Sequence, residues 1–246
     1  MSERFDPNSM CLWWPKIIDL GIPVPKTTIA QTPDECPDLL NQWMWAAIGE
    51  SDEGIPSGWG VWFQRVQELA DSIGYPLFVR TDLFSGKHGW NRTCYVPAAD
   101  DLERHLLWIV HDGELASFIG MRHRAVVLRE YLLLDSPFRA FEGMPVARER
   151  RYFVRDGEVI CHHPYWIADA MRWYAGTPKP RDWERDLAAL NEERAAEVKL
   201  LTEYATRVAA IMDGYWSVDF ACAHDGTWYL IDMARGENSW HPDHAD

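Results

Sequence analysis

Two short turn sequences, each lying between apolar runs, constrain the fold of this 246-residue chain more than any other feature. They are Asp156-Gly157 and His224-Asp225-Gly226. Asp-Gly between strand-like segments is typical of a tight hairpin, whose two strands pair antiparallel. The turns predict four strands, at residues 149–155, 158–163, 215–221 and 227–233. A chain organised by hairpins is expected to be an α+β protein rather than a doubly wound parallel sheet.

The rest of the chain alternates helical and extended patterns. Two prolines within residues 20–27 exclude a helix there and favour an extended segment. Apolar side chains that recur every three to four residues predict one long helix over residues 181–212. Further helices are expected at residues 34–48, 59–73 and 100–110, and further strands at residues 75–80, 92–96 and 125–134.

Composition narrows the class of protein. There are 24 Lys and Arg residues against 38 Asp and Glu, and the net charge of −14 disfavours nonspecific binding to nucleic acid or anionic lipid. No run approaches the ~20 apolar residues of a membrane span, and residues 1–6 lack a signal-peptide pattern. The five cysteines form no Cys-x-x-Cys pair and are interpreted as free thiols of a cytoplasmic protein. Residues 80–155 carry a slight excess of Lys and Arg, which is compatible with a small polyanionic ligand.

The segment 78–90 has a composition suited to phosphate binding. Arg80 ends a predicted strand, and Lys87 follows in a turn between Gly86 and Gly89. Glycines let backbone N–H groups approach an anion closely, and a lysine adds a mobile positive charge. The Walker A pattern is absent from this segment. The alternative is an ordinary hairpin turn with an exposed lysine.

The apolar strand at residues 126–132 contains one acid, Glu130, close to its end. Backbone groups of Glu130, Tyr131 and Leu132 could read the edge of an adenine ring, as the hinges of many nucleotide-binding proteins do. The alternative is an edge strand whose glutamate points outward. The pattern of residues leaves both interpretations open.

Arginines recur along the predicted strand 149–155. Alternation places Arg151, Phe153 and Arg155 on one face, with the intervening residues on the other face. Burying an arginine on a strand face is unfavourable without an acidic or phosphate partner. The alternative is that this face of an antiparallel sheet is solvated.

Two acids, Asp219 and Asp232, stand in the apolar strands of the last hairpin. Asp is depleted in strands and unfavourable in apolar surroundings, so each carboxylate needs a partner. The hairpin could bring both to one site, where hard oxygen ligands suit Mg²⁺ bridging to phosphates. Alternatively, each acid pairs with a nearby arginine. His162 and His163 are not expected to share a metal, since adjacent strand residues point to opposite faces.

The order of these segments, over residues 12–240, resembles the ATP-grasp superfamily. A Glu-x-Arg-x-Phe-Val strand at residues 149–154 and the acids of a Val-Asp and an Ile-Asp pair contribute most to the resemblance. It is strongest for compact, divergent members, which include phage-encoded proteins and the eukaryotic cell-division-cycle chaperones of translation initiation. The resemblance implies a nucleotide held between two α+β lobes. The implied parts are an N-terminal helical and extended region (residues 1–74), a small lobe (75–130) and a large lobe (131–246).

The resemblance also implies roles for individual residues. Phosphates would be bound by Arg80, Lys87 and Arg151, adenine by the hinge Glu130, Tyr131 and Leu132, and Mg²⁺ by Asp219 and Asp232. One position departs from the family pattern, which usually has Asn two residues after the last metal-binding acid, where this chain has Ala234. Asn238 could supply the missing oxygen if the intervening turn folds back. Arg235 could stabilise the transferring group.

The implied activity is that of an ATP- and Mg²⁺-dependent ligase that joins a carboxylate to an amine through an acylphosphate, with Arg151 and Arg235 as catalytic residues. Its acceptor would be a small molecule or a peptide, bound by variable loops such as residues 51–60, 135–145 and 175–182. The alternative is a nucleotide-binding assembly factor, chaperone-like and with a protein partner, for which ATP is a structural or switching ligand. A phosphotransferase that acts on protein or nucleic acid is a third interpretation.

Overall fold

The computed structural model of the protein describes residues 5–116, 122–173 and 178–241, and it divides into two compact units. The first unit contains residues 1–11 and 26–131, and the second contains residues 12–25 and 132–246. Each unit combines helices with an antiparallel sheet, which confirms the α+β prediction. All five cysteines are free thiols, as expected.

The first unit is built on a four-stranded sheet with the order β1-β4-β2-β3, in which all neighbouring strands are antiparallel. Its strands are β1 (Thr27–Gln31), β2 (Leu77–Thr81), β3 (Tyr95–Val96) and β4 (Ala125–Glu130). Strand β1 comes from the stretch 1–74 that the sequence sets apart, yet it pairs with β4 over its whole length. Since β4 lies between β1 and β2, the alternative that this strand is an edge strand is wrong.

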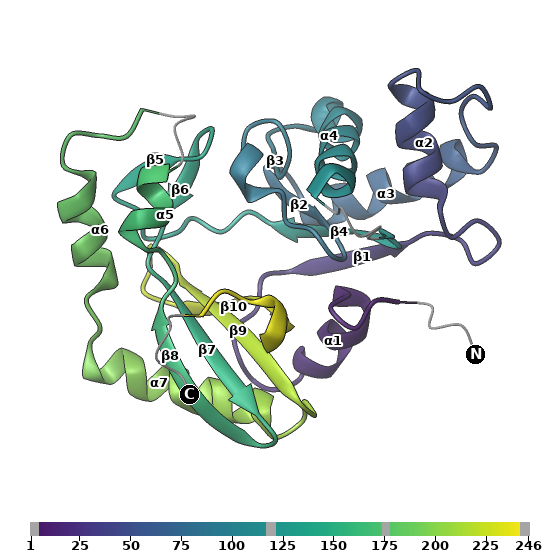
Figure 1. Ribbon diagram of the computed structural model, residues 1–246. Helices are drawn as coiled ribbons and strands as arrows, with labels where there is room; N and C mark the ends of the chain where they lie inside the picture. The colour runs from purple at the N-terminus through teal and green to yellow at the C-terminus, as the bar shows by residue number, and fades with distance from the viewer. Residues whose placement is uncertain (1–4, 117–121, 174–177, 242–246) are drawn as a thin grey trace. The chain divides into compact units, whose positions relative to one another are not determined.

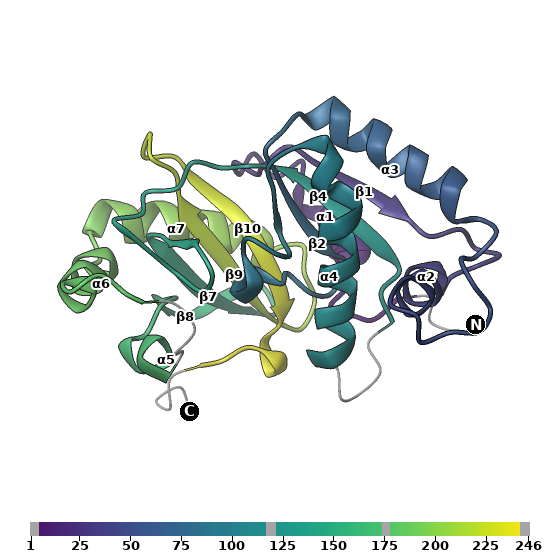
Figure 2. The ribbon, with the colours of Figure 1, turned by 90° about the horizontal axis from the view of Figure 1, so that it is seen from above.

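Helices cover one face of this sheet (Figure 2): α3 packs on β1 and β4, and α4 packs on β2. The helical elements are α2 (Leu39–Ala47), α3 (Trp59–Ile73), α4 (Leu102–Ala116) and the short turns η1 (Lys87–Gly89) and η2 (Ala99–Asp101). Three tryptophans join α2 to α3, with the rings of Trp43 and Trp59 stacked at 3.8 Å and that of Trp62 packed 5.5 Å from Trp59. These rings are buried, so they belong to the core.

The second unit is built on a sheet with the order β10-β9-β7-β8, again antiparallel throughout (Figure 1). Its strands are β7 (Glu149–Arg155), β8 (Glu158–Pro164), β9 (Tyr215–Cys222) and β10 (Trp228–Arg235). Both predicted hairpins are present. Asp156 and Gly157 have positive φ angles of 49° and 93°, which a two-residue turn requires. A small additional hairpin, β5 (Phe138–Ala140) with β6 (Met144–Val146), was not expected from the sequence.

The helices of the second unit differ from the sequence prediction in one respect. The expected helix over residues 181–212 is two helices, α6 (Trp183–Asn191) and α7 (Ala195–Ala209), because Glu192 is extended with ψ 121°. The break is stabilised by Arg150 of β7, whose Nη2 donates to the carbonyl oxygens of Leu190 and Glu192. These are carbonyls that the end of α6 leaves without helical partners.

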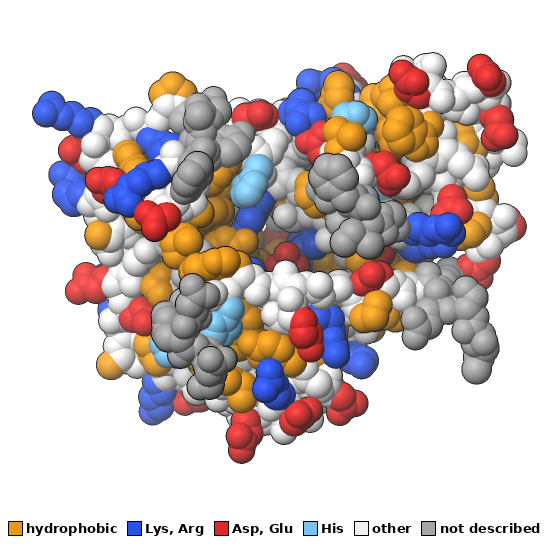
Figure 3. Space-filling model, viewed as in Figure 1, with side chains coloured by type: hydrophobic (Ala, Val, Ile, Leu, Met, Phe, Trp, Pro, Cys, Tyr) orange, Lys and Arg blue, Asp and Glu red, His pale blue; other side chains and the backbone are white. Residues whose placement is uncertain are grey.

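Other short elements complete the chain. They are α1 (Met10–Ile17), which begins in the first unit and contains Pro15, α5 (Ala168–Trp173) and the turn η3 (Gly236–Asn238). Within the described ranges, no helix combines the length and the apolar character needed to span a bilayer. On the face drawn in Figure 3, acidic and basic side chains are interspersed and form no large continuous basic patch.

Candidate functional site

Four polar side chains form a row across the sheet of the second unit. His163 of β8 lies opposite Arg151 of β7, Arg151 lies opposite Asp219 of β9, and Asp219 lies opposite Asp232 of β10. Residues directly opposite one another across antiparallel strands share a face of the sheet. The structure therefore brings together Arg151, Asp219 and Asp232, which the sequence singles out, and adds His163 to them.

Arg151 and Asp219 form a bidentate ion pair within this row. Nε of Arg151 donates to Oδ1 of Asp219 and Nη2 donates to Oδ2, both at 2.7 Å. The guanidinium carbon lies 4.7 Å from the centre of the Tyr165 ring, and Nη1 reaches the Trp240 carbonyl at 3.4 Å. Burial lowers the pKa of Arg151, but the neighbouring Asp219 outweighs it and the pKa lies above its ordinary value. The pairing of an acid with a nearby arginine, the alternative left open for Asp219, is thus present.

Asp232 lies at the other end of the row and is half-buried. Its Oδ1 accepts the N–H of Met233 at 3.0 Å, next to an irregularity in pairing between Leu230 and Asp232. Among the described residues, no group of three or more His, Cys, Asp or Glu side chains could hold a metal ion. Two carboxylates are nevertheless suitable donors for Mg²⁺, which commonly takes one or two protein carboxylates and fills its shell with water and phosphate oxygens.

The structure separates Arg235 from the row. Arg235 lies opposite Trp216, on the face of the sheet that carries neither Asp219 nor Asp232. Its guanidinium lies 5.1 Å from the Trp216 ring, and Nη1 is 3.5 Å from the Asp213 carbonyl. A direct part in the chemistry at the carboxylates would require Arg235 to leave these contacts.

The predicted substitute for the family asparagine, Asn238, is exposed in η3. Ala234 lies opposite Ser217, two residues along β10 from Asp232. The chain after η3 returns over β9, where Ser239 Oγ lies 2.7 Å from Ser217 Oγ. Gly236 permits this turn, because a Cβ there would lie 2.3 Å from the ring of Tyr215.

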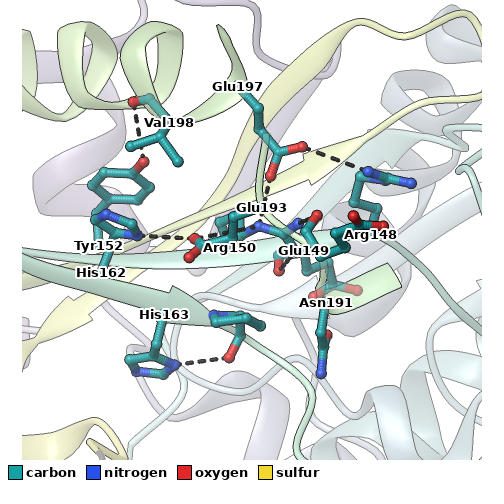
Figure 4. A network of polar contacts seen from close by, with 12 residues as sticks. Arg148, Glu149, Arg150, Tyr152, His162, His163, Asn191, Glu193, Glu197 and Val198 are labelled. Atoms are coloured by element: carbon teal, nitrogen blue, oxygen red, sulfur yellow. Dashed lines mark hydrogen bonds and ion pairs between the residues drawn. The ribbon is translucent and has the colours of Figure 1, made fainter. Parts of the chain in front are cut away.

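A buried charge network lies on the opposite face of the same sheet, against α6 and α7 (Figure 4). Nε of Arg150 is 2.7 Å from Oε1 of Glu197, and Arg148 reaches the same carboxylate at 3.6 Å. His162 lies on this face with Nδ1 2.9 Å from Glu193, whereas His163 lies on the other face and donates to the Pro164 carbonyl at 2.8 Å. The two histidines point apart, as alternation predicts.

In the first unit, Arg80 and Lys87 occupy different local settings. Arg80 is 5% exposed in β2, with Nε 3.1 Å from the Thr81 carbonyl. Lys87 begins η1 between the two glycines of the predicted phosphate loop. Thr93 Oγ1 fixes this loop, since it lies 2.5 Å from the Gly86 carbonyl and 2.8 Å from the Gly89 carbonyl. The loop is held at both glycines, with Lys87 between them.

The predicted adenine hinge combines a strand terminus with an aromatic cluster. The carboxylate of Glu130 accepts the backbone N–H of Lys26 at 2.7 Å, and the N–H of Glu130 donates to the Lys26 carbonyl at 2.9 Å. Glu130 thus fastens the segment before β1 to β4, a role that the sequence gives no sign of. The ring of Tyr131 lies 5.2 Å from Tyr95 and 6.3 Å from Trp90. Leu132 begins the second unit.

A surface hollow of about 740 Å³ lies in the first unit beside α2. It is lined by Gln42, Trp45, Glu50, Ser51, Glu53, Gly54, Ile55, Pro56 and Ser57. Its loop falls in residues 51–60, one of the segments considered for acceptor binding. Of the other two segments, residues 135–145 carry the β5–β6 hairpin, and residues 174–177 lie outside the described part of the chain.

Comparison with known proteins defines the class first: the fold and the sequence are those of an ATP-grasp protein. A model of the ATP-grasp domain, the one for family 3 of its clade, matches residues 56–246, and the chain belongs to this family. The resemblance inferred from the order of the sequence segments is thereby confirmed. A comparison with curated protein sequences found no match.

Solved structures with a similar fold include Cdc123 from Schizosaccharomyces pombe, with a TM-score of 0.55 at 14% identity over 92% of this chain and 82% of that chain. A C-terminally truncated Cdc123 from the same organism gives 0.53 at 14% identity, over 93% and 83%. D-alanine–D-alanine ligase from Bacillus anthracis, complexed with ATP, gives 0.45 at 13% identity and is matched over 53% of its length by 93% of this chain. At these identities the likeness concerns the fold alone.

Proposed function

We propose that this protein binds ATP with Mg²⁺ and uses it to join a carboxylate to an amine. The observation that carries the proposal is the row in which Arg151, Asp219 and Asp232 are direct cross-strand neighbours on one face of a sheet in an ATP-grasp protein. A guanidinium beside two carboxylates combines a binding group for phosphate oxygens with hard ligands for a divalent cation. Asp219 and Asp232 would hold the Mg²⁺, which offsets charge on the phosphates when bound.

The chain's own residues would then bind and orient the nucleotide. Arg80, Lys87 and Arg151 would contact phosphate oxygens, with Lys87 presented by the loop that Thr93 fixes. The backbone of Tyr131 and Leu132 would read adenine. Because the N–H of Glu130 is already bonded to the Lys26 carbonyl, Glu130 would support this hinge mainly through its position.

In the ligase reaction, a carboxylate oxygen attacks the γ-phosphorus of ATP, and the bond to the β-phosphate oxygen breaks to give an acylphosphate and ADP. An amine then attacks the acyl carbon, inorganic phosphate leaves, and the amine loses a proton to form the amide. Positively charged side chains stabilise the charge that develops during phosphoryl transfer. Positioning of the two reactants contributes the remainder, and no covalent nucleophile from the protein is needed.

The proposal is tested with Mg²⁺-ATP and pools of amino acids, peptides and other metabolites that carry a carboxylate or an amine. Acceptor-dependent release of ADP supports ligase activity. Thermal stabilisation by Mg²⁺-ATP tests binding independently of turnover. The absence of both a thermal shift and a calorimetric signal with Mg²⁺-ATP would refute the nucleotide site.

A second candidate is a nucleotide-binding assembly factor without ligase turnover. Ala234 favours it, because this side chain offers no oxygen at the position where the family usually has asparagine, and Asn238 lies exposed in η3. Here ATP would act as a structural or switching ligand for binding a protein partner. Saturable Mg²⁺-ATP binding with no ADP release across the acceptor pools would support this function over the ligase.

A further inference from the structure

We propose that Arg151 occupies the metal-binding carboxylate of Asp219 in the nucleotide-free protein and leaves it only when phosphate oxygens replace that carboxylate. Cation binding at Asp219 and Asp232 then depends on the nucleotide. This inference rests on the proposed ATP site and concerns how that site is controlled.

The geometry of the pair closes Asp219 on the side that faces Arg151. Each carboxylate oxygen accepts one hydrogen bond from the guanidinium, both at 2.7 Å. The side chain of Asp219 is only 7% exposed and that of Arg151 is 12% exposed. Little of the carboxylate is therefore left for a cation to approach while Arg151 holds it.

Electrostatics acts in the same direction. While Arg151 is paired with Asp219, a divalent cation at this carboxylate would lie close to a fixed positive charge, and the repulsion is strong in a partly buried setting. Once Arg151 bonds to phosphate, Asp219 and Asp232 become two neighbouring carboxylates without that positive charge and attract a cation. The exchange is chemically matched, because a guanidinium binds carboxylate and phosphate through the same bidentate geometry.

The neighbouring Arg150 shows what a permanently fixed arginine looks like in the same strand. Its side chain is 1% exposed and is held by Glu197 and by the carbonyl oxygens of Leu190 and Glu192 at the end of a helix. Arg151 is more exposed, and beyond Asp219 its hydrogen-bond acceptor within the described ranges is the Trp240 carbonyl, at the long distance of 3.4 Å. Exchange of partners is therefore favoured at Arg151 and disfavoured at Arg150.

The test measures cation binding without nucleotide, using Mn²⁺ as a paramagnetic probe in the full-length protein. Wild type should bind Mn²⁺ weakly alone and tightly in the presence of a non-hydrolysable ATP analogue. Arg151→Gln should bind Mn²⁺ alone about tenfold more tightly than wild type, because a positive charge next to the carboxylates is removed. The gain should disappear in Arg151→Gln/Asp219→Asn. Arg151→Lys, which keeps the charge but not the bidentate geometry, should show a smaller gain.

Circular dichroism and thermal unfolding establish that each variant is folded, and Arg151→Lys supplies the comparison if Arg151→Gln is not. Unchanged Mn²⁺ affinity in the folded Arg151 variants, with tight Mn²⁺ binding to wild type in the presence of nucleotide, would overturn the partner exchange and leave the ATP site intact. Failure of wild type to bind Mn²⁺ with the analogue would refute both this inference and the proposed function.

Discussion

Arg151 and Asp219 face each other across β7 and β9 and are joined by two hydrogen bonds of 2.7 Å. The residue proposed for phosphate and the residue proposed for metal therefore share one interaction. A substitution of either changes the charge and the hydrogen bonding of the other. Asp232, one strand further from Arg151, gives the more direct test of the metal site.

Asp232→Asn is expected to weaken Mg²⁺-dependent ATP binding by about tenfold or more, since an amide is a much poorer ligand for Mg²⁺ than a carboxylate. The thermal stability should change little because Asp232 is half-buried and the amide oxygen can still accept the Met233 N–H. Calorimetric titration of ATP with Mg²⁺ and with a chelator measures the effect. Asp219→Asn serves as a comparison and should also lower stability, because it leaves Arg151 without its carboxylate partner. Equal ATP affinities for wild type and Asp232→Asn would count against the metal assignment.

Lys87→Ala should reduce affinity for ATP more than affinity for adenosine, because the loop between Gly86 and Gly89 presents a charge that only the phosphates use. A loss of about tenfold for ATP with little change for adenosine is the expected result. Lys199→Ala is the matched control, since this exposed lysine lies on α7, which covers the opposite face of the second sheet. Equal losses for both ligands would mean that Lys87 does not contact the phosphates.

The Arg150–Glu197 pair is expected to be a structural element with no role in nucleotide binding. Glu197→Leu should lower the free energy of unfolding by about 3–5 kcal/mol, because it leaves a buried guanidinium without its counter-charge. Arg150→Met/Glu197→Leu should recover part of that loss, since neither charge is then buried. Urea unfolding of the two variants and wild type gives the comparison. A double variant less stable than Glu197→Leu alone would show that Arg150 acts mainly through the carbonyl oxygens of Leu190 and Glu192.

Features fixed by local chemistry were predictable from the sequence. The Asp-Gly turns define the hairpins, and side-chain alternation defines the two faces of β7. The same alternation places Arg235, three residues after Asp232, on the opposite face, so its separation from the carboxylates was also available from the sequence. The specific pairing of Arg151 with Asp219 was left open between two alternatives, because residues 68 positions apart are matched only by the strand register.

Features that depend on distant partners were not predictable. The apolar period continues through residues 181–212, yet the helix breaks where Arg150, 40 residues earlier than Leu190, binds the exposed carbonyl oxygens. Glu130 likewise binds the backbone of Lys26, 104 residues away. A single sequence carries no local signal for either contact. Tertiary partners therefore decide both the helix break and the role of Glu130.

Burial of His123 predicts a pH dependence of stability in the first unit. Its side chain is 1% exposed, neither ring nitrogen has a hydrogen-bond partner in the described structure, and burial lowers its pKa to about 4. The unfolded chain, with a pKa of about 6.5, binds the proton more tightly, so stability is full above pH ~6.5 and falls as the pH drops toward 4, by at most about 3 kcal/mol. Urea unfolding of wild type and His123→Leu at several pH values isolates this contribution, because all other titrating groups are shared. The difference between the two curves should change across this window, and parallel curves would show that His123 is protonated in the folded protein.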